Sequence, residues 1–280
     1  MEEITIKSPA KINLALDIVG KREDGYHEIE TVMHQVELCD LIKVEDSDEM
    51  KIDCNDKIPL KGNLVLKAVK LLKGRYNLTR NVSITIEKNI PVAAGLGGGS
   101  SNAALTLIAL DKLWGLNLKQ EELISLAKEI GSDVPFFIAG NAAYATGKGE
   151  LLQKLDPINF YAVLINPGFD VSTKWAYESL NLGLTGKKLA SREILKCVKK
   201  NNLREIAQFL HNDFETVVLD KYPVLKEIKD SLVANGALNS VMSGSGPTIF
   251  GIFEDEEKAK NAYEKLKGSY KFVYLTKTLS

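Results

Sequence analysis

Hydrophobic and polar positions alternate near the start of the chain, from residue 11 to residue 18. Aliphatic side chains occupy every second position there, which is the period of a half-buried β-strand. Lys11 and Asn13 therefore project from the face opposite the aliphatic row, a face that lies either in solvent or in a cleft. The strand is expected to end in a polar loop, Lys21 to His27, with a turn at Asp24-Gly25.

The rest of the pattern divides the chain into a strand-rich first half and a second half in which several helices surround a few strands. The change comes near Asp156-Pro157, so we expect one domain over residues 1–156 and another over residues 157–280. Strands are predicted at 29–38, 42–45, 51–54, 142–146 and 161–166, and a tight turn between two further strands at 243–247. Helices are predicted after Asn63 and at 121–130, 192–200, 203–210 and 224–234, and a short apolar helix is predicted to start at 132–135.

A run of glycines and serines, Gly95 to Ser101, lies between an alternating apolar segment and a helical pattern with Ala103, Leu107, Leu110 and Trp114 on one face. Glycines allow the backbone to approach a ligand closely. The first turn of the following helix offers unpaired N–H groups and a positive dipole end, which suit a phosphate. The hydroxyl groups of Ser100 and Ser101 could reach a phosphate oxygen or its Mg²⁺.

A flexible linker, a Walker A loop and a Rossmann fingerprint each fit this glycine-rich loop less well. Flexible Gly/Ser linkers rarely join a strand directly to an amphipathic helix. A Walker A loop needs a lysine after its last glycine, and Ser100 occupies that position. Ser100 also stands where a Rossmann fingerprint needs its third glycine. The loop is therefore still expected to bind phosphate, although it contains neither of these two common phosphate-binding motifs.

Composition narrows the function further. The net charge of −1 gives no overall field that would attract nucleic acid or an anionic membrane. The start of the chain has no signal-like segment and no apolar run is long enough to span a bilayer, so we expect a cytoplasmic protein. The three cysteines are scattered, which predicts reduced thiols, and the spacing of the three histidines predicts no metal-ligand cluster.

Three segments resemble the GHMP kinase superfamily, in the order found there: Ser-Pro-Ala-Lys-Ile-Asn ending at Asn13, the segment from Pro91 to Asn102, and Met-Ser-Gly-Ser-Gly-Pro starting at Met242. The resemblance implies a two-domain α+β fold with the active site in the cleft between the domains. It implies a ribosomal-protein-S5-like, ATP-binding N-terminal domain and a ferredoxin-like C-terminal α/β substrate domain.

The extra glycines of the loop, with residues 24–27 and 131–137, resemble the branch that phosphorylates the 2-hydroxyl group of CDP-methylerythritol with Mg²⁺ and ATP. A sibling kinase for homoserine or mevalonate is the nearest alternative, although neither substrate has a base to stack on Tyr26 and His27. A lyase like diphosphomevalonate decarboxylase and a non-catalytic ligand sensor are two further alternatives. No protein partner is indicated.

The resemblance assigns the catalytic roles to Lys11 and Asp133. Asp133 would orient the acceptor hydroxyl and take its proton, and Lys11 would stabilise charge on the transferred phosphoryl group. Without the resemblance, the N-terminal cap of a short helix is the better interpretation of Asp133. Lys11 would then be an exposed charge on an edge strand.

The resemblance also assigns the binding residues. Asn13 would contact the methylerythritol end of the substrate, and Tyr26 and His27 would recognise cytidine with Tyr177 on the other side of the base. A hairpin aromatic beside a solvent-facing histidine, and a plain turn at 244–246, are the structural alternatives. Gly244, Ser245 and Gly246 would approach the substrate, and Asn63 would contact the adenine of ATP. Ser100 or Ser101 would lie near Mg²⁺. The residues that would contact the ATP phosphates are Pro91, Val92, Ala93, Ala94, Gly95, Leu96, Gly97, Gly98, Gly99, Ser100 and Ser101.

Overall fold

The computed structural model describes residues 2–56, 62–181, 183, 185 and 189–280. They form two compact units whose segments interleave along the chain. The predicted division between residues 156 and 157 stays a prediction, and the compact units are divided at other points. The first unit comprises Met1–Ala10, Leu38–Val92 and Gly97–Gly140, and the second unit comprises Lys11–Glu37, Ala93–Leu96 and Asn141–Ser280.

Two long strands, β1 (Glu3–Lys21) and β2 (His27–Ser47), contribute residues to both units. The polar loop between them is as predicted, with Gly25 at a φ of 84° that favours glycine. The strands predicted separately at 29–38 and 42–45 are one strand, so that prediction was wrong.

The polar residue Asp40 accounts for the error. It interrupts the apolar pattern but is fully buried, because its carboxylate has three partners. The backbone N–H groups of Asn89 and Ile90 donate to Asp40 Oδ1 over 2.8 and 2.9 Å, and the Lys88 ammonium pairs with Oδ2. A buried carboxylate with this many partners can remain inside a sheet.

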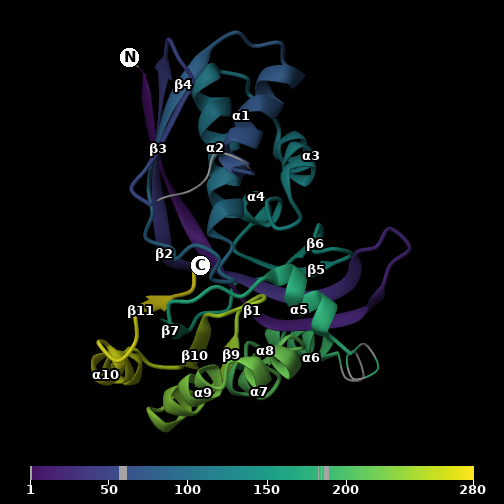
Figure 1. Cartoon of the computed structure of the whole chain (residues 1–280), viewed down its shortest axis with the longest axis vertical. Coiled ribbons are helices and arrows are strands. Elements are labelled where there is room, and N and C mark those ends of the chain that lie inside the picture. The colour runs from purple at the N-terminus through teal and green to yellow at the C-terminus, as the bar shows by residue number, and fades with distance from the viewer. Residues whose placement is uncertain (1, 57–61, 182, 184, 186–188) are drawn as a thin grey trace. The chain divides into compact units, whose positions relative to one another are not determined.

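In the first unit, helices pack on strands of a sheet. Helices α1, α2 and α3 contact one another and lie side by side in Figure 1. Helix α1 begins as predicted, because Asn63 Oδ1 accepts hydrogen bonds from the N–H groups of Val65 and Leu66. Besides parts of β1 and β2, the elements are β3 (Lys51–Cys54), β4 (Asn81–Glu87), α1 (Leu64–Arg75), α2 (Gly98–Trp114), α3 (Gln120–Ile130) and α4 (Phe136–Ala139).

In the second unit, β1 and β2 are joined by three short strands. Strand β5 (Ala142–Thr146) pairs antiparallel with β2, β6 (Leu151–Lys154) pairs with β5, and the two-residue β8 (His211–Asn212) pairs parallel with β1. Strand β1 is therefore bordered by β2 and β8 and does not form a sheet edge at this point.

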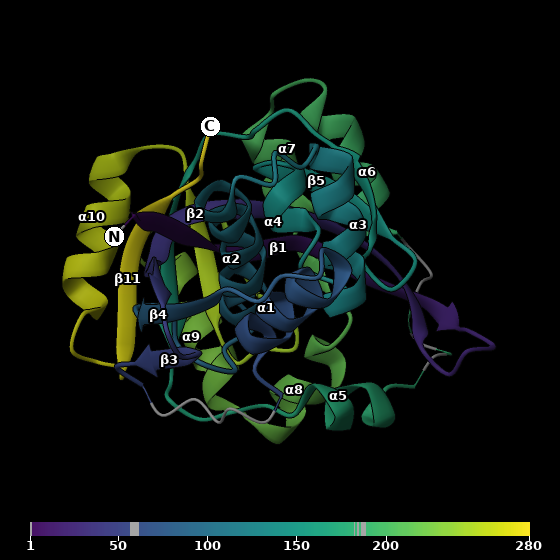
Figure 2. The ribbon, with the colours of Figure 1, turned by 90° about the horizontal axis from the view of Figure 1, so that it is seen from above.

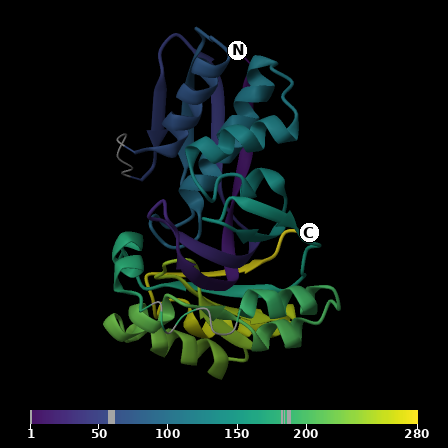
Figure 3. The same ribbon diagram turned by 90° about the vertical axis from the view of Figure 1, so that its right-hand side faces the viewer.

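A four-stranded antiparallel sheet in the order β11-β7-β10-β9 forms the other part of the second unit. Helices α9 and α10 pack on it, α10 running beside β11 in Figure 2, and the green helices follow one face of the sheet in Figure 3. Its elements are β7 (Tyr161–Asn166), β9 (Asn239–Met242), β10 (Ile249–Phe253), β11 (Phe272–Lys277), α5 (Thr173–Ser179), α6 (Ala190–Val198), α7 (Leu203–Gln208), α8 (Glu215–Lys221), α9 (Val224–Ala234) and α10 (Glu256–Leu266).

The three cysteines are free, as expected for reduced thiols. In the part of the chain that the structure describes, every helix is too short or too polar to cross a bilayer.

A buried histidine of β2 predicts a loss of stability in acid. His34 is fully buried; its Nε2 accepts from the N–H group of Ile158 over 3.0 Å, and its Nδ1 lies 2.8 Å from the Gln35 carbonyl oxygen. Burial lowers its pKa to about 4 from an ordinary 6.5. The folded protein favours neutral His34, so this stability is full above pH 6.5 and is lost as the pH falls toward 4.

We expect roughly 3 kcal/mol of unfolding free energy to be lost through His34 between pH 7 and pH 4. Urea denaturation across this range, compared with His34→Gln, checks the value, because the amide does not titrate. Identical pH dependence in the two proteins would assign the acid sensitivity to other groups.

Candidate functional site

Lys11 and Asn13 are buried on one face of β1, with 4% and 2% of their surface exposed. The Lys11 ammonium donates to Asn13 Oδ1 over 2.5 Å. The interpretation of Lys11 as an exposed charge on an edge strand was therefore wrong. Burying an ammonium group is unfavourable without polar partners, so its placement among polar groups points to a chemical role.

Two residues that sequence reasoning missed complete the surroundings of Asn13. Asn13 Nδ2 donates to Thr31 Oγ1 over 2.8 Å, and the hydroxyl group of Ser243 lies 3.5 Å from Asn13 Oδ1. Thr31 lies on β2 and Ser243 follows β9. Ser243 stands in the glycine-rich motif, but neither side chain has a spacing that would single it out.

Gly95 and the turn after β9 lie against each other. Gly95 has a φ of 77°, and a Cβ atom built on it would lie 2.0 Å from the Ser243 carbonyl oxygen. The Ser243 hydroxyl donates to the Gly95 carbonyl oxygen over 2.9 Å. A Cβ on Gly244 would be 3.0 Å from that same oxygen and 3.4 Å from Lys11 Nζ. The fold thus brings Lys11, Asn13, Gly95 and Gly244 together from three distant motifs.

The rest of the predicted turn, Ser245 and Gly246, is also held by specific contacts. Ser245 Oγ lies 2.7 Å from Thr173 Oγ1 at the start of α5. Gly246 has a φ of 81°, and a Cβ on it would lie 2.5 Å from Met242 Sδ. The turn between two strands was predicted correctly, and its glycines are required by sterics.

The residues before the glycine loop divide into buried and exposed positions. Ala94 and Leu96 are buried, and the N–H group of Lys11 donates to the Leu96 carbonyl oxygen over 2.9 Å. Val92 and Ala93 are exposed and Pro91 is half-buried. Leu96 therefore anchors the loop to β1, and the buried side chains of Ala94 and Leu96 are inaccessible to a ligand.

Helix α2 begins with open backbone N–H groups. Gly97 is its N-cap with a φ of 69°, no side chain of the described residues caps it, and its first turn contains no acidic residue. A Cβ on Gly98 would lie 3.1 Å from the Lys88 ammonium. Half-buried Gly98 and exposed Gly99 are followed by half-buried Ser100. This combination of glycines and N–H groups uncapped by side chains fits a phosphate, while the nearby Lys88 ammonium is already paired with Asp40.

Ser100 and Ser101 differ in accessibility. Ser101 is fully buried, and its Oγ lies 2.7 Å from the Ser8 hydroxyl oxygen, which donates its single proton to Asn102 Oδ1 over 2.8 Å. Ser101 therefore holds the start of α2 against β1 within the first unit. Of the two predicted metal contacts, only Ser100 presents surface to a ligand.

Asp133 lies in a turn that leads into α4. It is half-buried, and the helix begins three residues later, at Phe136, with Pro135 as its N-cap. Asp133 is therefore not the N-cap residue of this helix, and the capping interpretation was wrong in this respect. The turn itself is held by the N–H group of Val134, which donates to the Gly131 carbonyl oxygen over 3.2 Å.

Of the three side chains predicted to recognise cytidine, two stack on each other and the third is exposed. The rings of His27 and Tyr177 stack directly, with centroids 4.6 Å apart and planes 17° apart. Tyr177 also packs edge to face against Phe214, with ring centroids 4.8 Å apart. Tyr26 is 58% exposed, with the Lys148 ammonium 4.5 Å above its ring. Rings in direct contact leave no space for a base between them, so a base would stack on an open face or separate them.

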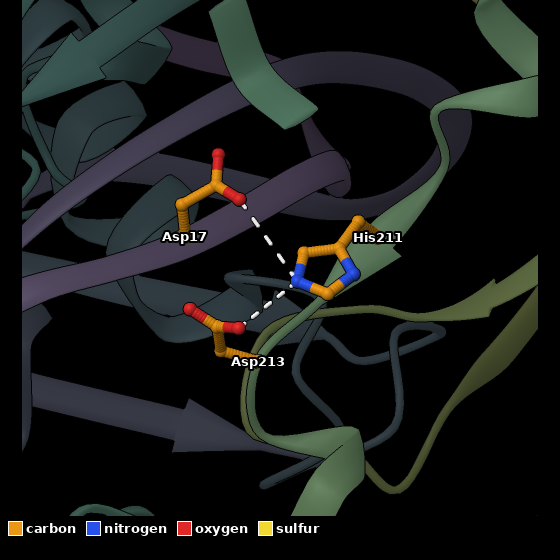
Figure 4. A group of neighbouring side chains, drawn as sticks. All are labelled: Asp17, His211 and Asp213. Atoms are coloured by element: carbon orange, nitrogen blue, oxygen red, sulfur yellow. Dashed lines mark hydrogen bonds and ion pairs between the residues drawn. The ribbon is translucent and has the colours of Figure 1, made fainter. Parts of the chain in front are cut away.

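A second group of titratable side chains consists of Asp17, His211 and Asp213 (Figure 4). His211 Nε2 lies 2.9 Å from Asp213 Oδ1 and 3.9 Å from Asp17 Oδ1. The hydrogen bond to Asp213 raises the pKa of His211, while burial raises the pKa of Asp17. Each residue offers a ligand atom within 4.8 Å of the others, a grouping that the sequence spacing did not predict.

The backbone satisfies both carboxylates of this group. The N–H group of Ile18 donates to Asp213 Oδ2 over 2.6 Å, and that of Ser191 donates to Asp17 Oδ2 over 2.8 Å. The group therefore ties β1 to β8 and to the start of α6. These contacts give the cluster a structural role that needs no metal ion.

Two protein families match the chain. The GHMP kinases N terminal domain matches residues 63–141, and the GHMP kinases C terminal family matches residues 194–271. The first match contains the glycine loop and Asp133, and the second contains the turn after β9. Both agree with the resemblance inferred from the motifs.

Individual relatives align over the whole chain. The 4-diphosphocytidyl-2-C-methyl-D-erythritol kinase of Thermoanaerobacter pseudethanolicus is 43% identical, over 100% of this chain and 97% of its own length. The kinase of the same name from Caldanaerobacter subterraneus subsp. tengcongensis is 46% identical, over 99% and 97%. A crystal structure of 4-(cytidine 5'-diphospho)-2C-methyl-D-erythritol kinase matches with a TM-score of 0.86 at 32% identity, covering 99% of this chain and 100% of that one. The expected two-domain α+β GHMP kinase fold is confirmed.

Proposed function

Because the chain belongs to the 4-diphosphocytidyl-2-C-methyl-D-erythritol kinase family of the GHMP kinases, we propose that it transfers the γ-phosphoryl group of ATP to the 2-hydroxyl group of 4-diphosphocytidyl-2-C-methyl-D-erythritol. The reaction is a step of the non-mevalonate route to isoprenoid precursors. The observation that carries the proposal is the group of buried Lys11, Asn13 and Gly244 with half-buried Gly95, since three family motifs converge there.

The start of α2 would bind the phosphates of ATP. Its N–H groups are uncapped by side chains of the described residues, and its first turn contains no acidic residue. Each helix N-terminal interaction with an anion contributes about 0.3–1 kcal/mol. Several together could replace the lysine of a Walker loop, and Asn63, as the cap of α1, would lie on the adenine side of the nucleotide.

A bound Mg²⁺ would neutralise charge on the phosphates. Ser100 is the better of the two predicted serines to contact it, since Ser101 is buried against Ser8. Ser100→Ala should therefore raise the Mg²⁺ concentration needed for half-maximal activity by up to about tenfold, given the worth of one charge-assisted contact. Ser101→Ala should raise it less and should instead lower the melting temperature. Titrating Mg²⁺ at saturating ATP measures both variants, and a reversed order would remove Ser100 from the metal site.

Lys11 would act on the transferred phosphoryl group. Its ammonium is held at Asn13 by a 2.5 Å hydrogen bond, and a cation fixed in advance needs no reorganisation as charge develops. Asp133 would accept the proton of the acceptor hydroxyl and orient its oxygen for attack. Phosphoryl transfer then breaks the bond between the β-γ bridging oxygen and the γ-phosphorus of ATP and forms the new phosphomonoester, with ADP as leaving group.

Tyr26, His27 and Tyr177 would recognise the cytidine part of the substrate. Burial, with a smaller contribution from Lys21, lowers the pKa of His27, so its ring is neutral at pH 7 and can accept or donate a hydrogen bond. Aromatic faces stack on bases without needing a particular partner edge. This base recognition distinguishes the proposed substrate from homoserine and mevalonate.

A substrate comparison tests the proposal. Purified protein with Mg²⁺ and ATP is given 4-diphosphocytidyl-2-C-methyl-D-erythritol, homoserine or mevalonate in separate reactions, and ADP release is followed by a coupled assay. We expect turnover with the cytidine-linked substrate and background rates with the other two. Turnover with mevalonate or homoserine alone would replace the proposed acceptor, and CO₂ release from mevalonate diphosphate would indicate a lyase.

A further inference from the structure

The hydroxyl group of Thr31 connects two residues of β1 in one chain of hydrogen bonds. Thr31 is 1% exposed on β2. Its Oγ1 donates to the Ala15 carbonyl oxygen over 2.6 Å and accepts from Asn13 Nδ2 over 2.8 Å. A hydroxyl group has a single proton. Because that proton is committed to Ala15, the Thr31 oxygen can only accept a hydrogen bond from Asn13.

This arrangement determines which way the Asn13 amide faces. An amide has a donating NH₂ end and an accepting oxygen end. Asn13 must present its NH₂ group to Thr31, which leaves Oδ1 facing Lys11, whose ammonium donates to it over 2.5 Å. A flipped amide would place the NH₂ group against the Lys11 ammonium, so that two donors would face each other. It would also place Asn13 Oδ1 against Thr31 Oγ1, whose proton is donated to Ala15, so that two acceptors would face each other.

We propose that Thr31 is a positioning residue for phosphoryl transfer, which fixes the Asn13 amide so that its oxygen holds the Lys11 ammonium. The proposal rests on the function proposed above, since it concerns the same reaction. Thr31 acts through Asn13.

Two substitutions separate the hydroxyl group from the rest of the side chain. Thr31→Val keeps the shape and removes the hydroxyl, and Thr31→Ser keeps the hydroxyl. We expect T31V to lower kcat at least about tenfold, the usual consequence of losing one buried hydrogen bond that orients a reacting group. KM for ATP should stay within about twofold of the wild-type value. A tenfold change in this KM would require the loss of a second contact, one made to ATP. T31S should recover most of kcat.

A matched control accounts for simple loss of packing. Thr278 is also buried, at 5% exposed, and its Oγ1 accepts from the N–H group of Phe160 over 3.1 Å. Thr278→Val therefore leaves a buried backbone group unpaired, as T31V does, at a position outside the proposed site. It should lower the melting temperature comparably and leave kcat unchanged. Equal losses of kcat in T278V and T31V would overturn the positioning role.

A double-mutant cycle tests whether Thr31 acts through Asn13. If it does, adding T31V to Asn13→Ala should change kcat by less than about twofold, because the group that Thr31 orients is already gone. Multiplicative effects of the two substitutions would contradict the proposal. Should T31V not fold, Thr31→Ala replaces it in the cycle, because it also removes the hydroxyl.

One readout is independent of turnover. The Asn13 side-chain N–H signals are assigned by their absence in Asn13→Asp. The proton that donates to Thr31 should exchange slowly with solvent in the wild-type protein and in T31S, and at least about tenfold faster in T31V because its acceptor is lost. Unchanged exchange in T31V would overturn the hydrogen-bond role whatever the activity. A wild-type protein with slow exchange but no turnover would overturn the proposed function and keep the amide orientation.

Discussion

Replacing Asp133 with asparagine is expected to lower kcat by roughly 10²–10⁴-fold, the usual range for removing a general acid or base. The amide keeps the size of the side chain but cannot take the proton of the acceptor hydroxyl. Asp133 is half-buried in a turn before α4 and is not its N-cap, and asparagine keeps an accepting side-chain oxygen at the same place, so we expect the fold to remain intact. Steady-state kinetics with both substrates measure the effect, and KM for ATP should change little.

Asp53→Asn provides the control for this substitution. Asp53 is an exposed aspartate on β3, where it pairs with Lys51, and exposed pairs of this kind contribute little to stability. Its kinetics should match the wild type. An Asp133→Asn variant that keeps more than about a tenth of the wild-type kcat would leave no general-base contribution of the usual size, and the proton would then leave without side-chain assistance.

Gly95→Ala is expected to have the largest effect on stability. The added methyl group would lie 2.0 Å from the Ser243 carbonyl oxygen, a backbone atom, and the φ of 77° is unfavourable for alanine. The loop and the turn after β9 must then move apart, which also breaks the hydrogen bond from the Ser243 hydroxyl to the Gly95 carbonyl oxygen. We expect a loss of about 3 kcal/mol or more of unfolding free energy.

Chemical denaturation of G95A and Gly74→Ala checks this effect. Gly74 lies in α1, and a Cβ built on it meets no atom within 4 Å. Alanine has the higher helix propensity, so G74A should be as stable as the wild type or up to about 1 kcal/mol more stable. A G95A protein as stable as G74A would show that the loop does not lie against Ser243 as described.

The elements that were predictable from sequence are those in which local patterns and packing agree. The alternation from residue 11 to residue 18 fixed β1, and the helical period after the glycine loop fixed α2. Asn63 marked the start of α1 and Gly131 the end of α3, as capping residues do. Helix α10 was not predicted, since its sequence is mostly polar and only three of its residues are buried.

The candidate site was predictable only as far as its motifs extend. Lys11, Gly95 and Gly244 stand in recognisable segments, but their proximity depends on pairings between residues far apart in sequence. Ser8, Thr31 and Lys88 have no local signal, because each is defined by a partner elsewhere in the chain. The burial of Ser101 and the direct stacking of His27 on Tyr177 are likewise consequences of tertiary packing.

Phosphorus NMR of the purified protein incubated with Mg²⁺, ATP and the cytidine-linked methylerythritol tests the proposed phosphoryl transfer most directly. We predict a new phosphomonoester signal that grows in proportion to ADP, while both diphosphate phosphorus atoms of the substrate stay intact. ATP that remains unchanged, or is hydrolysed to ADP and inorganic phosphate without a new phosphomonoester, would contradict the account.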